Sequence, residues 1–499
     1  MARETFTILQ QFNLERKLVA ITGDNASNNP TLCRQLHKLL KKDFTNDITM
    51  ADCPFDTREL MQFKGDQSFV RCLAHTLNLI AKAILKALNA GSHKDAKKLI
   101  YEMAEKRIES FIDTPRSAIA RLRLIVLWLL MSEQRMLKFR EYSDVGLDYD
   151  VDTRWNALLK MLELAIRSRD AINLMCEEFK VLEPLKLSPT EWNFLGEIYE
   201  VMLPFYEKTL LVSQDAPTIT QATAIYWDLD DIMDDVIEKK ENYKFINEQI
   251  RHAVIAGRKV LDEYTCKMDT ETLILYAASV LDPRVKSEFL KAHLEEGAEA
   301  VIDNLRTHFK EISPAEEMLP DHPSGAVAEA RSAANPISFV GRSGRGLKMA
   351  SSRRRMLEKI QKDHYAAHAQ HLDEIDEWLS STPIQEQIPV NLTAEEDTKW
   401  LLAWWRTNRN RYPRMAKIAR RYLGIPASEV GVERLFSRGR DLLGLRRFAL
   451  QPGTMKMLTI LKAFHSDEVF RKALVDLDDE AIEEDVEVVI QGVKTPKNP

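Results

Sequence analysis

The chain has 499 residues, of which 45% are hydrophobic and 29% charged, and its formal net charge is −6. This length exceeds what one compact core usually holds, so we expect two or three structural regions of ordinary soluble composition. The longest apolar run, residues 124–131, is too short to cross a bilayer, and the first residues form no apolar signal segment. Five scattered cysteines indicate free thiols in a reducing compartment. Composition therefore predicts an intracellular protein without a membrane partner.

The N-terminal ninety residues alternate between helix and strand signals. Residues 5–13 predict a short helix, and the β-branched run 17–22 predicts a buried strand that ends at a Gly-Asp-Asn turn. Residues 29–42 have apolar residues at helical spacing after an Asn and a Pro. Residues 68–72 form a second candidate strand, followed at once by a helix to about residue 88. This β-α-β-α order is typical of an α/β sheet with covering helices.

The rest of the chain is predicted to be helical, with one long interruption. From about 95 to 311, apolar residues recur at helical spacing and strand signals vanish. Residues 312–346 are rich in Pro, Gly, Ala and Ser, which indicates a loop. An acidic run at 476–487 is typical of a solvated tail. Further helices are expected from about 353, over 395–423, over 428–443 and over 453–465.

Asp24 is the first candidate functional residue. It follows the first predicted strand, at the edge where α/β sheets expose functional groups. Such a carboxylate suits Mg²⁺, which takes hard oxygen ligands. The alternative is a strand-to-helix turn in which Asp and Asn side chains bond to nearby backbone. The residues alone favour the turn.

Cys72 and His75 form the second motif. Their spacing gives half a zinc site, but no partner pair lies at a finger-like distance. A structural role is therefore favoured, with Cys72 in the core and His75 bonded to a neighbouring loop.

Two further motifs combine arginine with aromatic residues. Arg154 beside Trp155 could clamp a phosphate and stack on an unpaired base, although a Trp at a helix start is also a common core anchor. The stretch 404–414 interleaves arginines with Trp and Tyr, which suits nucleic acid. There too a core Trp pair opposite a charged helical face is an alternative.

The last motif is the segment 426–437. Ser428 is a candidate N-cap, and Val432, Leu435 and Phe436 would form the buried face of the following helix. Glu433 lies within its first two turns, either as a functional acid or as a solvated charge.

Taken in this order, the motifs resemble the hAT superfamily of DNA transposases. The segment TGDNASNN resembles the family's second catalytic block, RCLAHTLNLIAKAI its Cys-x-x-His segment and TRWNALLKMLELAIRSRDAI its Arg-Trp block. YPRMAKIARRYLGIPAS and ERLFSRGRDLL resemble its C-terminal dimerisation region. The correspondence covers roughly residues 5–465. It implies an α+β, mostly α fold: an incomplete RNase H-like α/β core, a large α-helical insertion and a helical C-terminal dimerisation region.

The resemblance also implies a division of the chain. The expected regions are 1–90 as a partial RNase H-like core, 91–311 as the helical insertion, 312–352 as a flexible loop, 353–394 as the end of the insertion, 395–470 as the dimerisation region that completes the core, and 471–499 as an acidic disordered tail.

The family's catalytic set is two aspartates and a glutamate that hold two Mg²⁺ ions. By resemblance, Asp24 matches the second aspartate and Glu433 the glutamate, so these two are also the implied metal ligands. The first aspartate has no match, because the only acids before Asp24 are Glu4 and Glu15. We therefore expect a truncated or domesticated element, or an incomplete gene model. Strand cleavage is not expected, and Mg²⁺ would be the cofactor only of an active form.

The resemblance finally implies a nuclear protein that binds itself and DNA, without a small-molecule cofactor. Two alternatives stay open: a non-catalytic protein that dimerises and holds DNA, and an active metal-dependent transposase whose N-terminal part is missing from this sequence. A small-molecule enzyme has little support, because there is no Gly-rich phosphate loop. Expected DNA contacts are Arg154, Trp155, Arg353, Arg354, Arg355, Arg406, Arg409 and Arg411. Expected dimer contacts are Leu435, Phe436, Leu442, Leu458 and Leu461.

Overall fold

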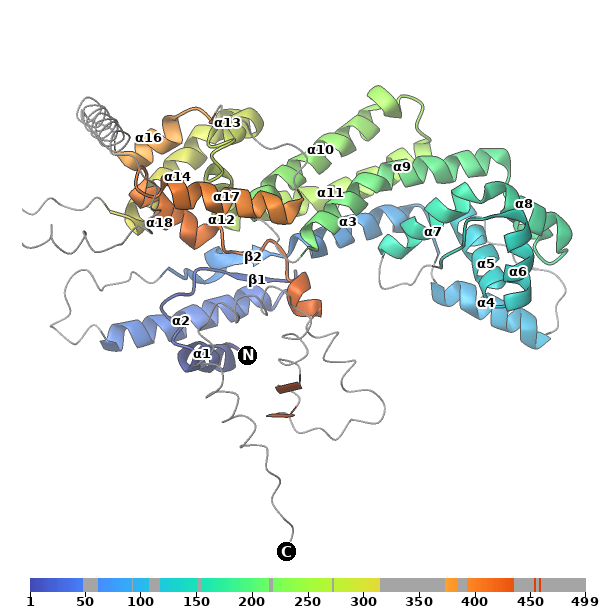
Figure 1. The fold of residues 1–499 in the computed structure, drawn as a ribbon, viewed down its shortest axis with the longest axis horizontal. Helices are drawn as coiled ribbons and strands as arrows, with labels where there is room; N and C mark the ends of the chain where they lie inside the picture. Colours follow the sequence, from blue (N-terminus) through green and yellow to red (C-terminus); the bar gives the residue numbers. More distant parts are fainter. Residues whose placement is uncertain are drawn as a thin grey trace, which may run out of the picture.

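The computed structural model forms an elongated, mostly helical body around a small parallel sheet (Figure 1). The fold class is α+β and mostly α, as the sequence predicts. Among the described helices, none is long and apolar enough to cross a membrane. The structure describes residues 1–47, 62–91, 93–106, 117–149, 155–214, 219–271, 273–314, 373–384, 393–434, 453–454 and 457–458.

The N-terminal α/β unit follows the predicted order of elements. Two parallel strands pair in the register Ile21 with Phe69 and Gly23 with Arg71. The first strand is shorter than the predicted run 17–22, because its paired part begins only at Ile21. Buried Cys33, Leu36, Leu40, Phe63 and Phe69 form the unit's own small core. The elements are α1 (Ala2–Gln11), β1 (Ile21–Gly23), α2 (Asn29–Asp47), η2 (Gly65–Ser68), β2 (Phe69–Arg71) and α3 (Leu73–Ala87).

Three long helices pack with α3 along the middle of the molecule: α9 (Pro189–Val212), α10 (Ala222–Glu238) and α11 (Glu248–Glu271). α11 approaches α3 closely, because Gly257 has no side chain at the contact. A Cβ at this position would lie 2.6 Å from Cγ1 of Ile84, which is fully buried. This crossing ties the α/β unit to the helical region.

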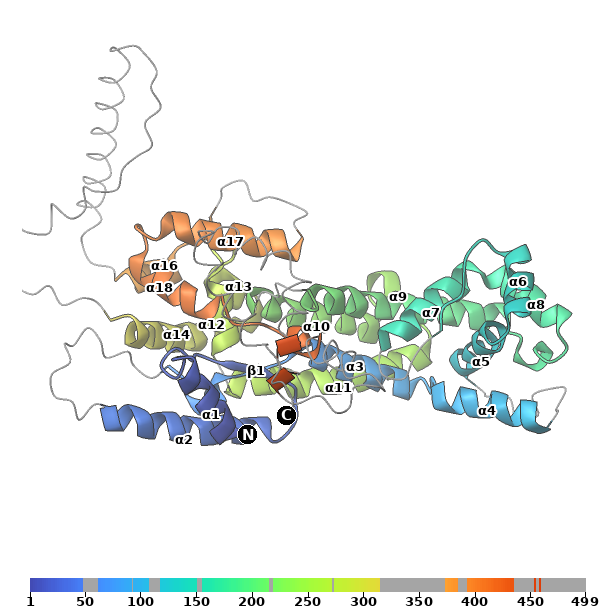
Figure 2. The ribbon, with the colours of Figure 1, turned by 60° about the horizontal axis from the view of Figure 1, so that its bottom comes forward.

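A helical lobe lies at one end of the molecule, far from α16, α17 and α18 in both views (Figure 2). Its central helix α5 is apolar on nearly every side, as expected of a helix buried all round. The lobe consists of α4 (His93–Lys106), α5 (Ala118–Leu130), α6 (Glu133–Tyr142), α7 (Trp155–Arg167) and α8 (Arg169–Glu178). Four short 3-10 helices lie between consecutive α-helices of the described chain: η3 (Glu183–Leu185), η4 (Ile219–Gln221), η5 (Glu241–Tyr243) and η6 (Glu295–Gly297).

The opposite end combines helices from before and after residues 315–372. Trp378, Trp404, Trp405 and Tyr412 form an aromatic cluster there, with the Trp378 and Trp405 rings 4.8 Å apart. The indole nitrogens of Trp378 and Trp405 donate hydrogen bonds of 2.9 Å to the carbonyls of Val280 and Leu281. The helices are α12 (Ile274–Val280), α13 (Glu288–Leu294), α14 (Ala298–Ile312), α16 (Glu374–Ser380), α17 (Ala394–Asn408) and α18 (Pro413–Tyr422).

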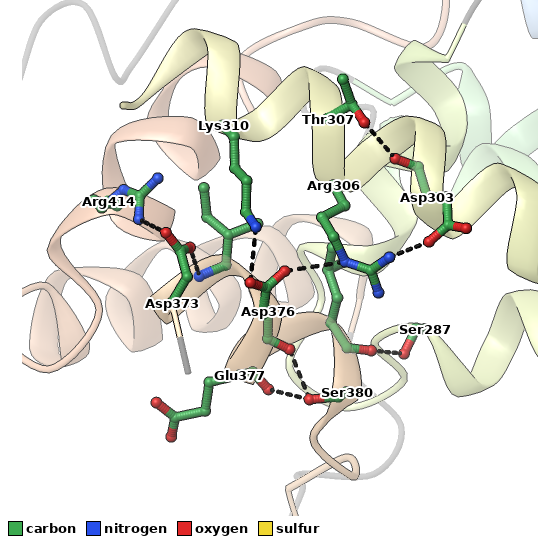
Figure 3. A network of polar contacts seen from close by, with 12 residues as sticks. Ser287, Asp303, Arg306, Thr307, Lys310, Asp373, Asp376, Glu377, Ser380 and Arg414 are labelled. Atoms are coloured by element: carbon green, nitrogen blue, oxygen red, sulfur yellow. Dashed lines mark hydrogen bonds and ion pairs between the residues drawn. The ribbon is translucent and has the colours of Figure 1, made fainter. Parts of the chain in front are cut away.

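Ion pairs fasten α16 between α14 and α18 (Figure 3). Asp376 lies 2.7 Å from the ammonium of Lys310 and 3.0 Å from Nε of Arg306, both on α14. Asp373, which caps α16, pairs at 2.6 Å with Arg414 of α18. The segment after residue 372 is therefore held to helices that precede residue 315.

Candidate active-site remnant and nucleic-acid interface

Asp24 lies directly after β1 and shapes the turn into α2. Its Oδ1 accepts hydrogen bonds from Nδ2 of Asn29 at 2.7 Å and from the backbone N–H of Ala26 at 3.1 Å. The same Asn29 amide also donates to the Asp24 carbonyl at 3.0 Å. These local bonds are those of the turn that the sequence left open as an alternative. One carboxylate oxygen is thereby occupied by the protein itself.

Residues 425–428 lie along the carboxyl ends of both strands. The Thr22 hydroxyl donates to the carbonyl of Pro426 at 2.7 Å, and the backbone N–H of Leu73 donates to the carbonyl of Ala427 at 3.0 Å. Ser428 is buried, and its hydroxyl donates to the carbonyl of Val212 at 2.7 Å. The predicted helix begins at residue 430 rather than directly at Ser428. The C-terminal region thus closes the end of the sheet where Asp24 lies.

This connection brings three carboxylates to one end of the sheet. Burial raises the pKa of Glu429, and the negative charges of Asp24 and Glu433 raise it further. Glu433 is exposed, and its backbone N–H donates to the carbonyl of Glu429 within the first helical turn. The two matched acids, Asp24 and Glu433, therefore both lie near Glu429, although about four hundred residues separate them in the sequence. Glu429 is the residue that the sequence interpretation missed, because its place at this end of the sheet depends on contacts between distant segments.

The acids do not form a complete metal site. Within the part of the chain that the structure describes, no group of three or more His, Cys, Asp or Glu side chains could hold a metal ion. Two-metal phosphoryl chemistry needs several carboxylates that converge on both ions. One carboxylate oxygen of Asp24, however, already accepts a hydrogen bond from the Asn29 side chain. The described residues therefore do not fit a two-magnesium centre.

Cys72 and His75 border the same site. Cys72 is the N-cap residue of α3, and its backbone N–H donates to the carbonyl of Gly23 at 2.8 Å. Its thiol is buried and lies 3.4 Å from the backbone nitrogen of Glu429. Burial raises the pKa of this thiol to about 11, which keeps it neutral. His75 is half-buried in the first turn of α3. This placement supports a structural role for the pair.

Thr76 connects the Asp24 turn to the long helices. Its hydroxyl oxygen lies 3.2 Å from Nδ2 of Asn25 and 3.5 Å from the hydroxyl of Tyr226 on α10. Burial raises the pKa of Tyr226 to about 12, so this hydroxyl remains a neutral donor. The turn is thus held from α3 and α10 as well as by its own bonds.

Two family models match the chain. One, described as the hAT family C-terminal dimerisation region, covers residues 374–464. The other, described as the ZBED1 RNase-like helical domain, covers residues 70–201. The chain is an hAT-family transposase-like protein.

Relatives of this hAT-family chain are distant but align over most of its length. It is 25% identical over 91% of its length to a putative transcriptional regulator, tpeD, of Talaromyces stipitatus. It is 23% identical over 87% to a putative AC transposase of Zea mays, and 22% identical over 80% to zinc finger BED domain-containing protein 4 of Homo sapiens. The matches cover 46%, 47% and 29% of those proteins. The chain therefore spans about half the length, or less, of these curated relatives.

Trp155 of the hAT-family chain is a core residue in this structure. It begins α7 and is 6% exposed, with its ring edge-to-face to Tyr206 at 6.4 Å. A ring in this position packs against the helices and is not presented to a base, which favours the core-anchor alternative. Contact with a base stays a prediction, and it requires the ring to leave this packing. Arg154 lies outside the described residues.

The basic stretch of the hAT region separates into a buried and an exposed part. Trp405 is buried in the aromatic cluster, whereas Arg406, Arg409 and Arg411 are exposed. Arg414 is held by Asp373 and donates to the Ser313 carbonyl at 2.8 Å. Among the described arginines of the stretch 404–414, Arg406, Arg409 and Arg411 are therefore the ones open to a ligand. Arg353, Arg354 and Arg355 lie outside the described residues.

The expected dimer contacts fall mostly beyond the described part of the hAT region. Leu458 is described and half-buried. In the same region, Leu402, Val432 and Met457 are large apolar side chains that are about half exposed. The prediction that Val432 lies on the buried face of its helix is therefore wrong. Leu435, Phe436, Leu442 and Leu461 lie outside the described residues.

Proposed function

We propose that this chain is a transposase-derived protein that self-associates through its hAT C-terminal region, holds nucleic acid and does not cut strands by itself. The observation that carries the proposal is the match of the hAT dimerisation region to residues 374–464. The described part of this region packs onto the carboxyl ends of β1 and β2. A dimer made through it would therefore place two such sheet ends in one particle.

Exposed apolar side chains in the hAT region support self-association. Val432 is 52% exposed, in the first turn of the helix that follows Ser428. Such surface is usually covered where it forms part of a larger apolar patch. Light scattering after size exclusion should give at least a dimer mass at micromolar concentration. Val432→Asp should weaken the dimer, whereas Leu210→Asp, on 47% exposed Leu210 of α9, should not. A monomeric wild-type chain would contradict the proposal.

The lack of cleavage is proposed from the acid set. Asp24, Glu429 and Glu433 are close enough to interact, but the described residues form no metal-binding group. Removing part of a catalytic unit that acts together usually abolishes most of the rate. The 499-residue chain with Mg²⁺ or Mn²⁺ should therefore leave hairpin and terminal-repeat DNA intact.

The second candidate is a metal-dependent transposase, and the meeting of Asp24 with the Glu429–Glu433 turn favours it. Its further ligand would come from sequence that corresponds to the uncovered part of the relatives. Cleavage that is lost in both Asp24→Asn and Glu433→Gln proteins would establish this function and refute the first.

Nuclear localisation is part of the same proposal. It rests on relatives named as a transcriptional regulator and as zinc finger BED domain proteins. A fluorescently tagged chain should concentrate in the nucleus, and uniform cytoplasmic fluorescence would contradict it.

A further inference from the structure

A basic pocket lies where the segment before β1 meets α18. Its volume is about 490 Å³, and it is lined by cations from two parts of the chain that are four hundred residues apart. Five of the seven lining residues are Arg or Lys, and the other two, Val19 and Gln62, are neutral. We call this the α18 basic pocket. Its cations are Arg16, Lys17, Lys417, Arg420 and Arg421.

The cations on α18 share one face. Lys417, Arg420 and Arg421 are spaced i, i+3 and i+4, which places them side by side on a helix. The other face is buried through Met415, Ile418, Ala419 and Tyr422. Like charges at this spacing repel one another and destabilise an isolated helix. A solvated face alone does not explain why a second basic segment meets this one.

Three of the five cations in the pocket have no compensating charge among the residues that the structure describes. No acidic residue is among the described lining residues. Lys17, Lys417 and Arg420 form no ion pair with any residue that the structure describes. Arg421 donates from Nη1 to the carbonyl of Ile312 at 3.2 Å, which fixes its guanidinium at the pocket wall. A concave site with converging cations focuses a positive potential and attracts anions.

The chemistry of the lining selects phosphate groups without reading bases. Arg and Lys side chains bind phosphate oxygens, and these contacts carry no sequence information. The described lining residues include no aromatic ring on which a base could stack. The pocket is also at the amino end of β1, since Lys17 and Val19 precede the strand while Asp24 follows it. It therefore lies at the other end of β1 from the acidic site, and Arg406, Arg409 and Arg411 are not among its lining residues.

We propose that the α18 basic pocket binds the phosphate backbone of a nucleic-acid strand. This rests on the proposed function, because it names where that function holds its nucleic acid. The nucleic-acid strand would be bound at the amino end of the β-sheet, jointly by the N-terminal segment and by the hAT region. Binding there should tolerate any base sequence and depend strongly on salt.

The test is fluorescence anisotropy of a labelled single-stranded oligonucleotide of mixed sequence with the full chain at several salt concentrations. The pocket variant is Lys417→Glu with Arg420→Glu. The matched control is Lys97→Glu with Arg140→Glu, which makes the same change in net charge on exposed residues of the helical lobe, far from α18. Circular dichroism should show that both variants fold, and Lys417→Gln with Arg420→Gln provides a milder pocket variant.

The pocket variant should bind at least about tenfold more weakly, and its slope of log affinity against log salt should fall by about 1–2. The control should change affinity less than about threefold and keep the wild-type slope. Equal losses in both variants would overturn the pocket assignment but leave nucleic-acid binding in place. A wild-type chain that binds no strand would instead refute the nucleic-acid part of the proposed function. Inorganic triphosphate that displaces the strand at equal phosphate concentration would assign the pocket to free polyphosphate and overturn the proposal.

Discussion

Replacing Gly257 with alanine tests the close crossing of α11 and α3. The new Cβ would lie 2.6 Å from Cγ1 and 2.9 Å from Cδ1 of Ile84. Ile84 is fully buried, so its side chain cannot swing into solvent. We therefore take the upper end of the cost of overpacking, about 3 kcal/mol. The helix gains about 1 kcal/mol from replacing Gly by Ala. The expected net loss in the free energy of unfolding is about 2 kcal/mol.

Urea unfolding followed by circular dichroism measures this loss. Gly196→Ala in α9 is the matched control, because a Cβ there would meet nothing within 4 Å. It should stabilise the chain by about 0.5–1 kcal/mol, so the two substitutions differ in sign. In a double-mutant cycle, Ile84→Ala should cost up to about 3 kcal/mol less in the Gly257→Ala background than alone, because it relieves the overpacking. Equal stabilisation by both glycine substitutions would refute the close crossing.

Three other outcomes follow from buried charges and thiols. Arg284 pairs with buried Asp282 and Asp397, so Arg284→Met should cost about 3–5 kcal/mol in urea unfolding, and a neutral result would contradict this pairing. Burial lowers the pKa of Lys286 to about 8, so the unfolded chain binds more protons above that pH. The stability of wild type relative to Lys286→Met should therefore rise from pH 8 to 10, and a flat difference would count against it. Iodoacetamide should label exposed Cys266 before the buried thiols in peptide mass spectrometry; equal labelling would oppose this.

Local sequence patterns were sufficient for the N-terminal elements. The Asn-Pro start predicted α2, and the run before Cys72 predicted β2, because these signals act within a few residues. The strand predicted from Lys17 was too long. A β-branched run shows the preference for an extended chain, whereas the length of a paired strand depends on its neighbour. Here the described pairing with β2 begins at Ile21.

The candidate site could be predicted only in part, because its geometry depends on contacts between distant segments. The family resemblance identified Asp24 and Glu433, but no local pattern shows that Pro426 meets Thr22. Glu429 was passed over for the same reason, since its proximity to Asp24 arises from that contact. At Trp155 the local sequence fits two roles, a core anchor and a base contact. The burial of its side chain in the structure favours the core anchor.

The contact between Thr22 and Pro426 can form only late during synthesis of the chain, because its two partners lie far apart in the sequence. A ribosome adds about 5–20 residues per second, so the 404 positions between these partners take about 20–80 s to translate. During that time the carboxyl ends of β1 and β2 have no C-terminal segment to accept their hydrogen bonds. Apolar surface and polar groups that stay uncovered during synthesis make a nascent chain prone to aggregation. The nascent chain therefore depends on water or a chaperone at these ends until residues 425–428 leave the ribosome.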